Sequence, residues 1–282
     1  MFGVLKNYLF DLRDRQRMNL ATSKGAAMRQ ARKVDLTLPT TWEFSGFSQN
    51  GEDGVLDVLR SQLLSSNRYF VEIGSADGME NNSSWLVVAE QYNGLMIEGS
   101  PALVERVNRL VVRHSIGVEC KNMFLTQENA RDLTALTMHQ DPDVFSLDID
   151  GNDYYVLQEL LENGLRPKII VVEYNSVYGP ERSMTIEYNK DFYFKKAHPT
   201  ELYYGVSIAG WRKILGNYGY RFVTVEKNGV NGFFVDPAFF DSAFLDGVQG
   251  CQFSENRYQL MKFRKPSEEQ FELIAGQKFF SI

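Results

Sequence analysis

The chain has 282 residues, of which 44% are apolar, and its formal net charge is −6. That apolar fraction suffices for a buried core and excludes a wholly disordered chain, while the net acidity argues against a nucleic-acid partner. Two cysteines exclude a disulfide framework and a four-cysteine zinc site. No apolar run is long enough for a membrane span, and Asp11 and Arg13 interrupt the stretch that a signal peptide needs, so we expect a cytoplasmic protein.

The N-terminal segment differs in charge from the rest of the chain. Residues 1–33 contain eight Lys or Arg against two Asp, so this segment carries +6 and the remainder −12. Apolar residues at helical spacing predict a helix here; they are Leu5, Tyr8, Leu9 and Leu12. We expect a helical N-terminal arm over residues 1–40 that serves either homo-oligomer formation or the binding of an anionic acceptor.

An alternation of helices and strands follows the arm. A helix of about 14 residues is predicted from Gly51, with Asn50 as its N-cap and Asp53 three positions on. The predicted strands lie at 69–73, 94–97, 115–118, 144–149 and 168–173. The predicted helices between them lie near 82–92, 101–112, 127–138 and 153–163. Near-continuous apolar strands in such an alternation indicate an α/β fold with a parallel sheet covered on both faces.

The last third of the chain predicts a different arrangement. Beyond a helix that ends near residue 218, the runs 220–226 and 230–235 flank Lys227-Asn228-Gly229, a spacing typical of a hairpin. The segment 176–205 is long for a loop and rich in Tyr and Phe, which indicates a flap on the acceptor side of a site. Residues 237–282 form a C-terminal extension that is irregular and then weakly helical.

A glycine turn after the first predicted strand is the first candidate site. Gly74 and Gly78 let a ligand approach the backbone closely. Glu98 ends the next strand, where doubly wound sheets bind a ribose diol, because a carboxylate accepts two hydroxyl hydrogen bonds. An ordinary tight turn and a solvated Glu are the alternative. The turn lacks Gly-x-Gly-x-x-Gly and any phosphate-binding Lys motif, which favours a ligand with one ribose and no phosphate.

Acidic residues also collect where the fourth and fifth strands are predicted to end. Asp148, Asp150 and Asp153 follow one strand, and Glu173 and Asn175 end the next. Carboxylates this close repel one another, so at least one should be protonated, paired or bound to a cation. A Mg²⁺ or Ca²⁺ site built from Asp150, Glu173 and Asn175 is one outcome; helix capping and hydrogen bonds to a substrate hydroxyl are the others.

The three histidines are scattered along the chain. His198 lies in the aromatic flap and is therefore a candidate general base. His114 and His139 fall at a helix end and in a polar turn, where structural or solvated roles are expected.

Six phrases of the sequence, taken in order, resemble the FkbM-like group of S-adenosylmethionine-dependent methyltransferases. They are FSQNGED (47–53), VEIGSADGMENN (71–82), GLMIEGS (94–100), SLDIDGNDY (146–154), VVEYN (171–175) and NGFFV (231–235). The resemblance implies a class I methyltransferase fold, which is a Rossmann-like, doubly wound and mostly parallel seven-stranded sheet whose last strand is antiparallel. It also implies a methyltransferase domain over 41–236, between the arm and the C-terminal extension.

The resemblance further implies S-adenosylmethionine, which carries one ribose and no phosphate, as the cofactor. It places Gly74 and Gly78 beside the methionine part and Glu98 on the ribose. The other residues that it brings to the cofactor are Gln49, Asp53, Glu72, Asp77 and Asp148. Related sugar methyltransferases use strand-end carboxylates for a divalent metal and a nearby base, which makes Mg²⁺ a second candidate cofactor.

The chemistry that follows is an SN2 methyl transfer in which acceptor, methyl group and sulfur are aligned. The catalytic candidates are Asp150, Asp153 and His198, with Asp153 where some relatives place a histidine. We expect O-methylation of a hydroxyl on a small polar acceptor, such as a sugar, a sugar nucleotide or a precursor in capsule or surface-polysaccharide biosynthesis.

Two other functions compete with this one. A metal-dependent glycosyltransferase would use Asp148 and Asp150 as its DxD motif and would bind a nucleotide sugar. A non-catalytic assembly protein could also be built on a methyltransferase fold. The glycine turn with Glu98 favours a phosphate-free nucleoside over the first, and acidic residues at the strand ends favour an enzyme over the second.

Overall fold

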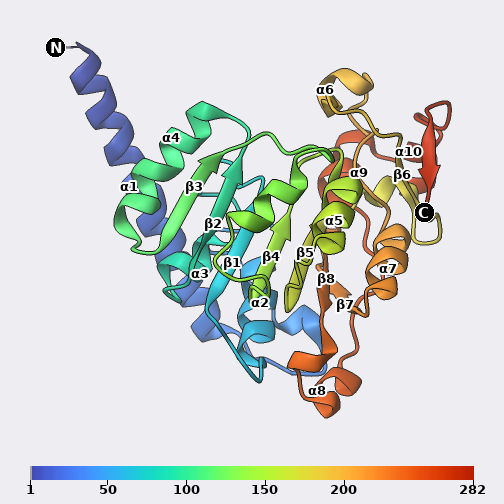
Figure 1. Ribbon diagram of the computed structural model, residues 1–282, viewed down its shortest axis with the longest axis horizontal. Coiled ribbons are helices and arrows are strands. Elements are labelled where there is room, and N and C mark those ends of the chain that lie inside the picture. The colour runs from blue at the N-terminus through green and yellow to red at the C-terminus, as the bar shows by residue number, and fades with distance from the viewer. Residues whose placement is uncertain (1) are drawn as a thin grey trace.

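The computed structural model describes the backbone of residues 2–282 and the side chains from residue 12 onward. Its centre is a seven-stranded sheet in the order β3-β2-β1-β4-β5-β8-β7 (Figure 1). The strands are β1 (Tyr69–Ile73), β2 (Asn93–Glu98), β3 (Val118–Asn122), β4 (Val144–Leu147), β5 (Ile169–Glu173), β7 (Arg221–Val225) and β8 (Asn231–Val235). Strand β8 pairs antiparallel with both neighbours, and the other pairs are parallel. The predicted fold, doubly wound and mostly parallel with a terminal hairpin, is confirmed.

Helices cover both faces of the sheet because its strands alternate apolar side chains between the two. Phe70 packs on the face that carries α1 (Phe2–Ala31), α2 (Glu52–Ser61), α3 (Ser84–Val88) and α4 (Pro101–Leu110). Val71, the next residue, packs on the face that carries α5 (Asp153–Glu162), α7 (Ile208–Asn217) and the 3₁₀ helix Ala130–Ala135. Burial of apolar surface on both sides is what the near-continuous apolar strands predicted.

Several of the predicted elements differ in detail. The helix expected near 82–92 is limited to Ser84–Val88, and the strand expected over 144–149 ends at Leu147. The third strand begins at Val118 and not at residue 115, because Gly117, with φ 87°, forms the turn before it. The helix expected near 127–138 is a short 3₁₀ helix, Ala130–Ala135. Helix α2 has Gly51 as its N-cap with φ 108°, so Asn50 does not cap it.

The predicted helix over 1–33 is confirmed as α1, which extends to Ala31. Its N-terminal turns project beyond α4, and its second half runs along the body (Figure 1). At Gly25 this packing is so close that an added Cβ would lie 2.4 Å from the Trp85 ring. The side chains of Leu5, Tyr8 and Leu9, on which the prediction partly rests, lie outside the described residues.

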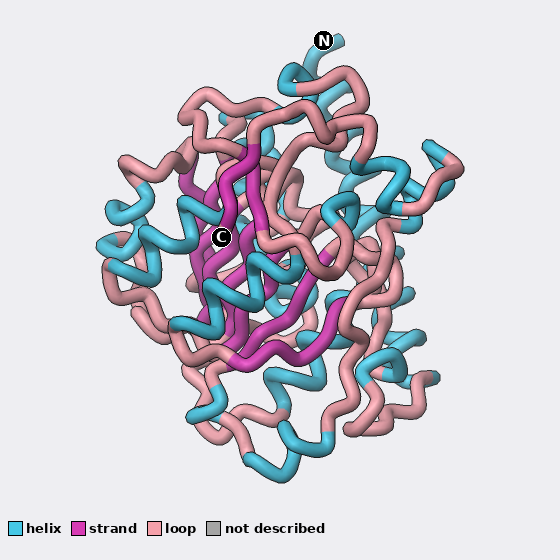
Figure 2. The backbone as a smooth tube through the Cα atoms, turned by 90° about the vertical axis from the view of Figure 1, so that its right-hand side faces the viewer, coloured by secondary structure: helices cyan, strands magenta, loops and turns pink. Residues whose placement is uncertain are grey.

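The aromatic segment 176–205 packs against the end of the chain. It contains the 3₁₀ helix Ser176–Tyr178, β6 (Met184–Ile186) and α6 (Phe194–Ala197), and β6 pairs with β9 (Phe279–Ser281). Figure 2 views the molecule from the side on which the chain ends. The remaining helices are α8 (Ser242–Gly247), α9 (Arg257–Phe263) and α10 (Ser267–Phe271), with 3₁₀ helices at Pro39–Thr41, Val112–His114 and Pro237–Phe239. Among the described residues, no helix is both long and apolar enough to cross a bilayer.

Candidate active site

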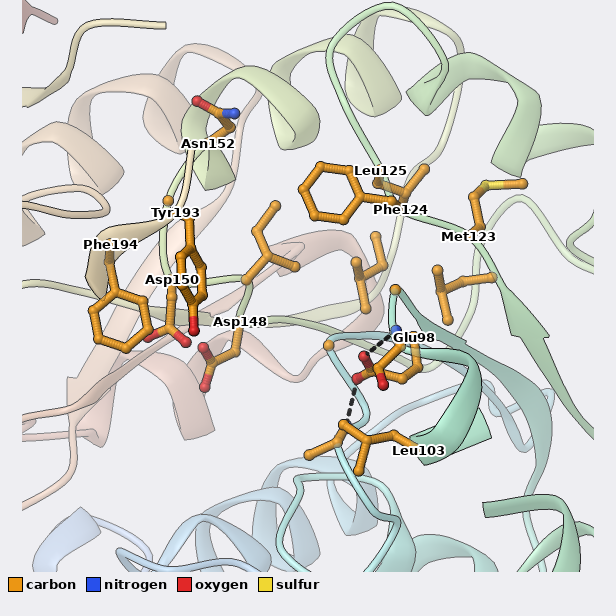
Figure 3. A pocket seen from close by; sticks show the side chains of 18 of the residues that line it. Glu98, Leu103, Met123, Phe124, Leu125, Asp148, Asp150, Asn152, Tyr193 and Phe194 are labelled. Carbon is orange, nitrogen blue, oxygen red and sulfur yellow. Dashed lines mark hydrogen bonds between the residues drawn. The ribbon is translucent and has the colours of Figure 1, made fainter. Parts of the chain in front are cut away.

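A cavity of about 880 Å³ opens where the parallel strands reach their carboxyl ends. In a parallel sheet these ends share one edge, which is where doubly wound folds bind ligands. The cavity is lined by the turn after β1, the end of β2, the segment 123–125 after β3, the segment 148–152 after β4, and residues 192–195 of the flap. Figure 3 shows side chains from these segments around the opening.

Gly74 stands at the centre of this arrangement. Its φ is +85°, and an added Cβ would lie 1.7 Å from the carbonyl oxygen of Asp148. Only glycine allows the turn after β1 to pass this close to the end of β4. Gly78, with φ +72°, completes the same turn and faces Val107 and Val111 instead of the cavity.

Glu98 lines the cavity from the end of β2. Its carboxylate accepts hydrogen bonds from the amides of Ala76 at 3.0 Å and Ser100 at 2.8 Å (Figure 3). A carboxylate offers about four lone-pair positions, so two remain for a further pair of donors. Apolar side chains lie beside it on the cavity wall; they are Ile97, Leu103, Met123, Phe124 and Leu125.

Three carboxylates gather on the side of the cavity opposite Glu98, where Asp148 and Asp150 line it and Glu173 lies behind the lining. One oxygen each of Asp148, Asp150 and Glu173 lies within 4.8 Å of the others. Burial, followed by the neighbouring carboxylates, raises the pKa of Asp148 and of Glu173 well above the usual range. Burial and Asp153 raise the pKa of Asp150 to about 6. Among the described residues, the Oε2 atom of Glu173 is buried and has no hydrogen-bond partner.

Three other predicted catalytic or metal residues have partners elsewhere, and none of them lines the cavity. Asp153 accepts from the amides of Ile149 at 3.0 Å and Gly151 at 2.8 Å, which closes the loop before α5. Asn175 donates to the carbonyls of Leu202 and Tyr204 and so ties the flap to β5. His198 has its Nδ1 atom 2.7 Å from the Thr200 hydroxyl. Asp148, predicted on the cofactor side, joins Asp150 and Glu173 in the acidic cluster, while the Asn175 amide is engaged by the flap.

Two predicted cofactor residues are buried beneath the cavity and not in its lining. Glu72 accepts from the Asn82 amide at 2.8 Å and from the Ser83 hydroxyl, and burial raises its pKa to about 7. Asp53 accepts from the amides of residues 46, 47 and 48 at 2.7, 2.7 and 3.0 Å, and burial raises its pKa to about 7. Both hold a loop in place: Asp53 the loop that carries Gln49, and Glu72 the segment after the glycine turn.

The rest of the lining combines predicted and unpredicted residues. Gln49 and Asp77, two of the predicted cofactor residues, line the cavity, and Gln49 donates to Glu80 at 3.0 Å. Glu80 and Arg106 were not singled out in the sequence, because each is one charged residue of a loop or an exposed helix face. The aromatic content of the flap was the signal for Phe192, Tyr193 and Phe194.

No protein-family model matches the sequence, and no curated protein matches it either. Among solved structures, the chain is similar to an O-methyltransferase from Bacillus cereus in complex with SAH, at 14% identity and a TM-score of 0.44, over 78% of this chain and 89% of that one. It is similar to an SAH-bound methyltransferase from Podospora anserina at 10% identity and a TM-score of 0.45, over 77% and 87%. A methyltransferase from Geobacter sulfurreducens is 13% identical with a TM-score of 0.40, over 66% and 77%. Likeness at this level concerns the arrangement of strands and helices, so function has to be argued from the site.

Proposed function

We propose that the chain is an S-adenosylmethionine-dependent methyltransferase that transfers the methyl group to a hydroxyl of a small polar acceptor. The observation that carries this proposal is the position of Glu98 in the cavity. Its carboxylate has two lone-pair positions left over, an apolar wall on one side, and the glycine turn on the other. A ribose diol on the carboxylate and an adenine against the apolar wall fit this arrangement without any phosphate-binding group.

The proposed reaction places the acceptor between the acidic cluster and the flap. S-adenosylmethionine supplies the methyl group, which the acceptor oxygen takes in an SN2 displacement as the bond to sulfur breaks. Asp150 lines the cavity next to Tyr193 and Phe194 (Figure 3), and a pKa of about 6 leaves it ionised at neutral pH. It is therefore the proposed base that receives the hydroxyl proton. The aromatic side chains orient the acceptor and exclude water.

A divalent cation fits the same cluster. Asp148, Asp150 and Glu173 supply carboxylate oxygens within 4.8 Å of one another, and the buried Oε2 atom of Glu173 has no other partner in the described part of the chain. Mg²⁺ prefers such oxygen ligands. When bound, the cation would lower the cost of forming the alkoxide-like nucleophile. We propose Asp148, Glu173 and one oxygen of Asp150 as its ligands, which leaves the second Asp150 oxygen to receive the acceptor proton and leaves Asn175 to its structural role.

Titration calorimetry tests the cofactor. We expect S-adenosylmethionine and S-adenosylhomocysteine to bind the full chain with one site, and a UDP-sugar not to bind. Absence of binding by the first two would refute the proposal, and binding of the UDP-sugar alone would favour the glycosyltransferase with Asp148 and Asp150 as its DxD motif.

The acceptor class needs a separate experiment. We propose a sugar, a sugar nucleotide or a surface-polysaccharide precursor. The sequence resemblance supports this class, and so do the aromatic side chains of Phe192, Tyr193 and Phe194 in the lining of the cavity. Cell metabolites incubated with the protein and methyl-labelled S-adenosylmethionine should yield one product that gains a single labelled methyl group on oxygen. Mass spectrometry identifies that product.

The role of the cation is tested separately. A Glu173→Gln protein assayed with and without added Mg²⁺ reports whether the cation contributes to methyl transfer.

A further inference from the structure

The N-terminal helix contributes charge to one wall of the cavity. Arg17 of α1 donates to Asp77 at 3.2 Å and to Glu80 at 3.3 Å. Asp77 and Glu80 both line the cavity, at the end where Gln49 donates to Glu80. We call Gln49, Asp77, Glu80 and Arg106, which share this end, the polar wall. A segment 60 residues away in the sequence thus holds the carboxylates of the polar wall in position.

A second arginine joins the polar wall to the same helix. Arg106 of α4 lines the cavity and lies 2.9 Å from Asp77 and 2.8 Å from Asp14 of α1. Asp14 is only 1% exposed, and Arg109 lies 3.6 Å from its second oxygen. A buried carboxylate is retained only where it is paired, so α1 is anchored beside the cavity at this point.

Charges of both signs meet at this wall. The carboxylates of Asp14, Asp77 and Glu80 pair with the guanidinium groups of Arg17, Arg106 and Arg109, and Arg13 also lies 3.9 Å from Asp14. A phosphate would require an excess of positive charge on the side that faces the cavity. Facing the cavity are two carboxylates, one guanidinium and one amide. Such a set complements a zwitterion, since the carboxylates accept from an ammonium group and the guanidinium and amide donate to a carboxylate.

We infer that the polar wall binds the α-amino-acid end of the cofactor and that α1 is required for this recognition through Arg17. This inference rests on the proposed function, because it takes the cofactor to be S-adenosylmethionine. Arg17 is a positioning residue: it does not line the cavity, and it acts by fixing Asp77 and Glu80. The basic helix, which the sequence leaves outside the methyltransferase resemblance, thereby supports the ligand site through its ion pairs with Asp77 and Glu80.

The test compares two ligands that differ only at the amino-acid end. S-adenosylhomocysteine carries this end, and 5′-methylthioadenosine has adenine and ribose but lacks it. In an Arg17→Ala protein we expect the affinity for S-adenosylhomocysteine to fall about ten-fold, the scale of one lost charge-assisted interaction, while the affinity for 5′-methylthioadenosine stays within two-fold. An Arg17→Lys protein should recover part of the loss.

The matched control is Arg29→Ala on the same helix. Arg29 pairs with Glu90 at 2.7 Å and with Asp57 at 3.0 Å, and none of the three lines the cavity. We expect this variant to bind both ligands as the parent chain does. Binding of 5′-methylthioadenosine also shows that each variant is folded.

The outcomes separate the inference from the function on which it rests. If the parent chain binds neither ligand, the proposed function fails and the inference fails with it. If Arg17→Ala weakens both ligands equally, or weakens neither, the methyltransferase proposal stands and the role of α1 in head-group recognition is refuted. Loss confined to S-adenosylhomocysteine supports the inference.

Discussion

The Glu98 carboxylate accepts a hydrogen bond from the Ala76 amide at 3.0 Å, so the end of β2 is tied to the turn after β1. The two segments are adjacent because β1 and β2 pair in parallel, with Ile73 opposite Ile97. With Ser100 holding the other oxygen at 2.8 Å, the carboxylate has a fixed orientation before any ligand arrives. A preorganised acceptor of this kind binds a diol with little further ordering cost.

Replacing Glu98 should therefore weaken cofactor binding more than the loss of a single charge suggests. In Glu98→Gln the amide presents only one oxygen, so its NH₂ group opposes a backbone donor and fewer acceptors remain for the diol. We expect the Kd for S-adenosylhomocysteine to rise about ten- to a hundred-fold by calorimetry, the scale of one or two lost hydrogen bonds to a charged group. Glu119→Gln on β3, where the side chain is exposed, is the control; an equal effect there would contradict the assignment.

Gly74 offers a test of the backbone arrangement. In Gly74→Ala the new methyl group would meet the Asp148 carbonyl at 1.7 Å and the residue would have to adopt φ +85°. Gly164→Ala is the matched control, because Gly164 has φ +95° with nothing within 4 Å of an added Cβ. We expect the control to lose about 1 kcal/mol of unfolding free energy and Gly74→Ala to lose at least about 2 kcal/mol more, measured by urea denaturation. Equal losses would show that the close approach is not required.

The apolar runs of the sequence predicted the sheet and the edge of the sheet at which the cavity opens. The apolar run before Gly74 and the one before Glu98 are strands whose ends meet, as their pattern indicates. Strand β3 was misplaced because it is an edge strand in which Glu119 and Lys121 interrupt the apolar run. The pair between Arg17 and Asp77 leaves no local pattern, since it joins segments 60 residues apart, and it emerges only from packing.

A similar limit applies to the carboxyl groups. Glu72 and Glu98 lie in neighbouring strands and on the same face of the sheet, and the sequence predicted both as cofactor residues. Glu72 lies opposite Met96, two residues before Glu98, so Glu98 stands nearer the carboxyl edge and lines the cavity, whereas Glu72 is buried and does not. Asn175 was predicted beside Asp150 and Glu173, and its amide also donates to the carbonyls of Leu202 and Tyr204, a pairing that no local pattern indicates. Residue type and spacing therefore predicted which segments form the site. They did not predict how far along its strand each carboxylate stands or which groups form hydrogen bonds with it.

Burial of Glu72 predicts a pH dependence of stability. Its folded-state pKa is raised from 4.5 to about 7, so the folded chain holds a proton that the unfolded chain has lost between these values. The contribution of this group to stability is thus present below pH 4.5 and is lost as the pH rises through 7. In Glu72→Gln both hydrogen bonds can be kept, with the side-chain oxygen accepting from the Asn82 amide and the NH₂ group donating to the Ser83 hydroxyl.

We therefore expect the unfolding free energy of Glu72→Gln, relative to the parent chain, to increase between pH 5 and pH 8 by an amount on the order of 3 kcal/mol. Urea denaturation at four pH values measures it. Glu105→Gln, at an exposed position of α4, should show no such trend. A flat difference for Glu72→Gln would mean that the carboxylate is ionised in the folded chain at neutral pH.

The flap provides a way to separate the acceptor from the cofactor. Tyr193 lines the cavity beside Asp150 and is 50% exposed, so its ring is available to a ligand and its removal leaves no buried void (Figure 3). In Tyr193→Ala we expect the KM for the acceptor to rise about ten-fold, the scale of one lost stacking contact, with the Kd for S-adenosylhomocysteine unchanged. Tyr258→Ala removes a 68% exposed ring that does not line the cavity and should alter neither value. A change in the Kd for S-adenosylhomocysteine without a change in the acceptor KM would show that Tyr193 contacts the cofactor instead. The acceptor would then have to enter the cavity from another side.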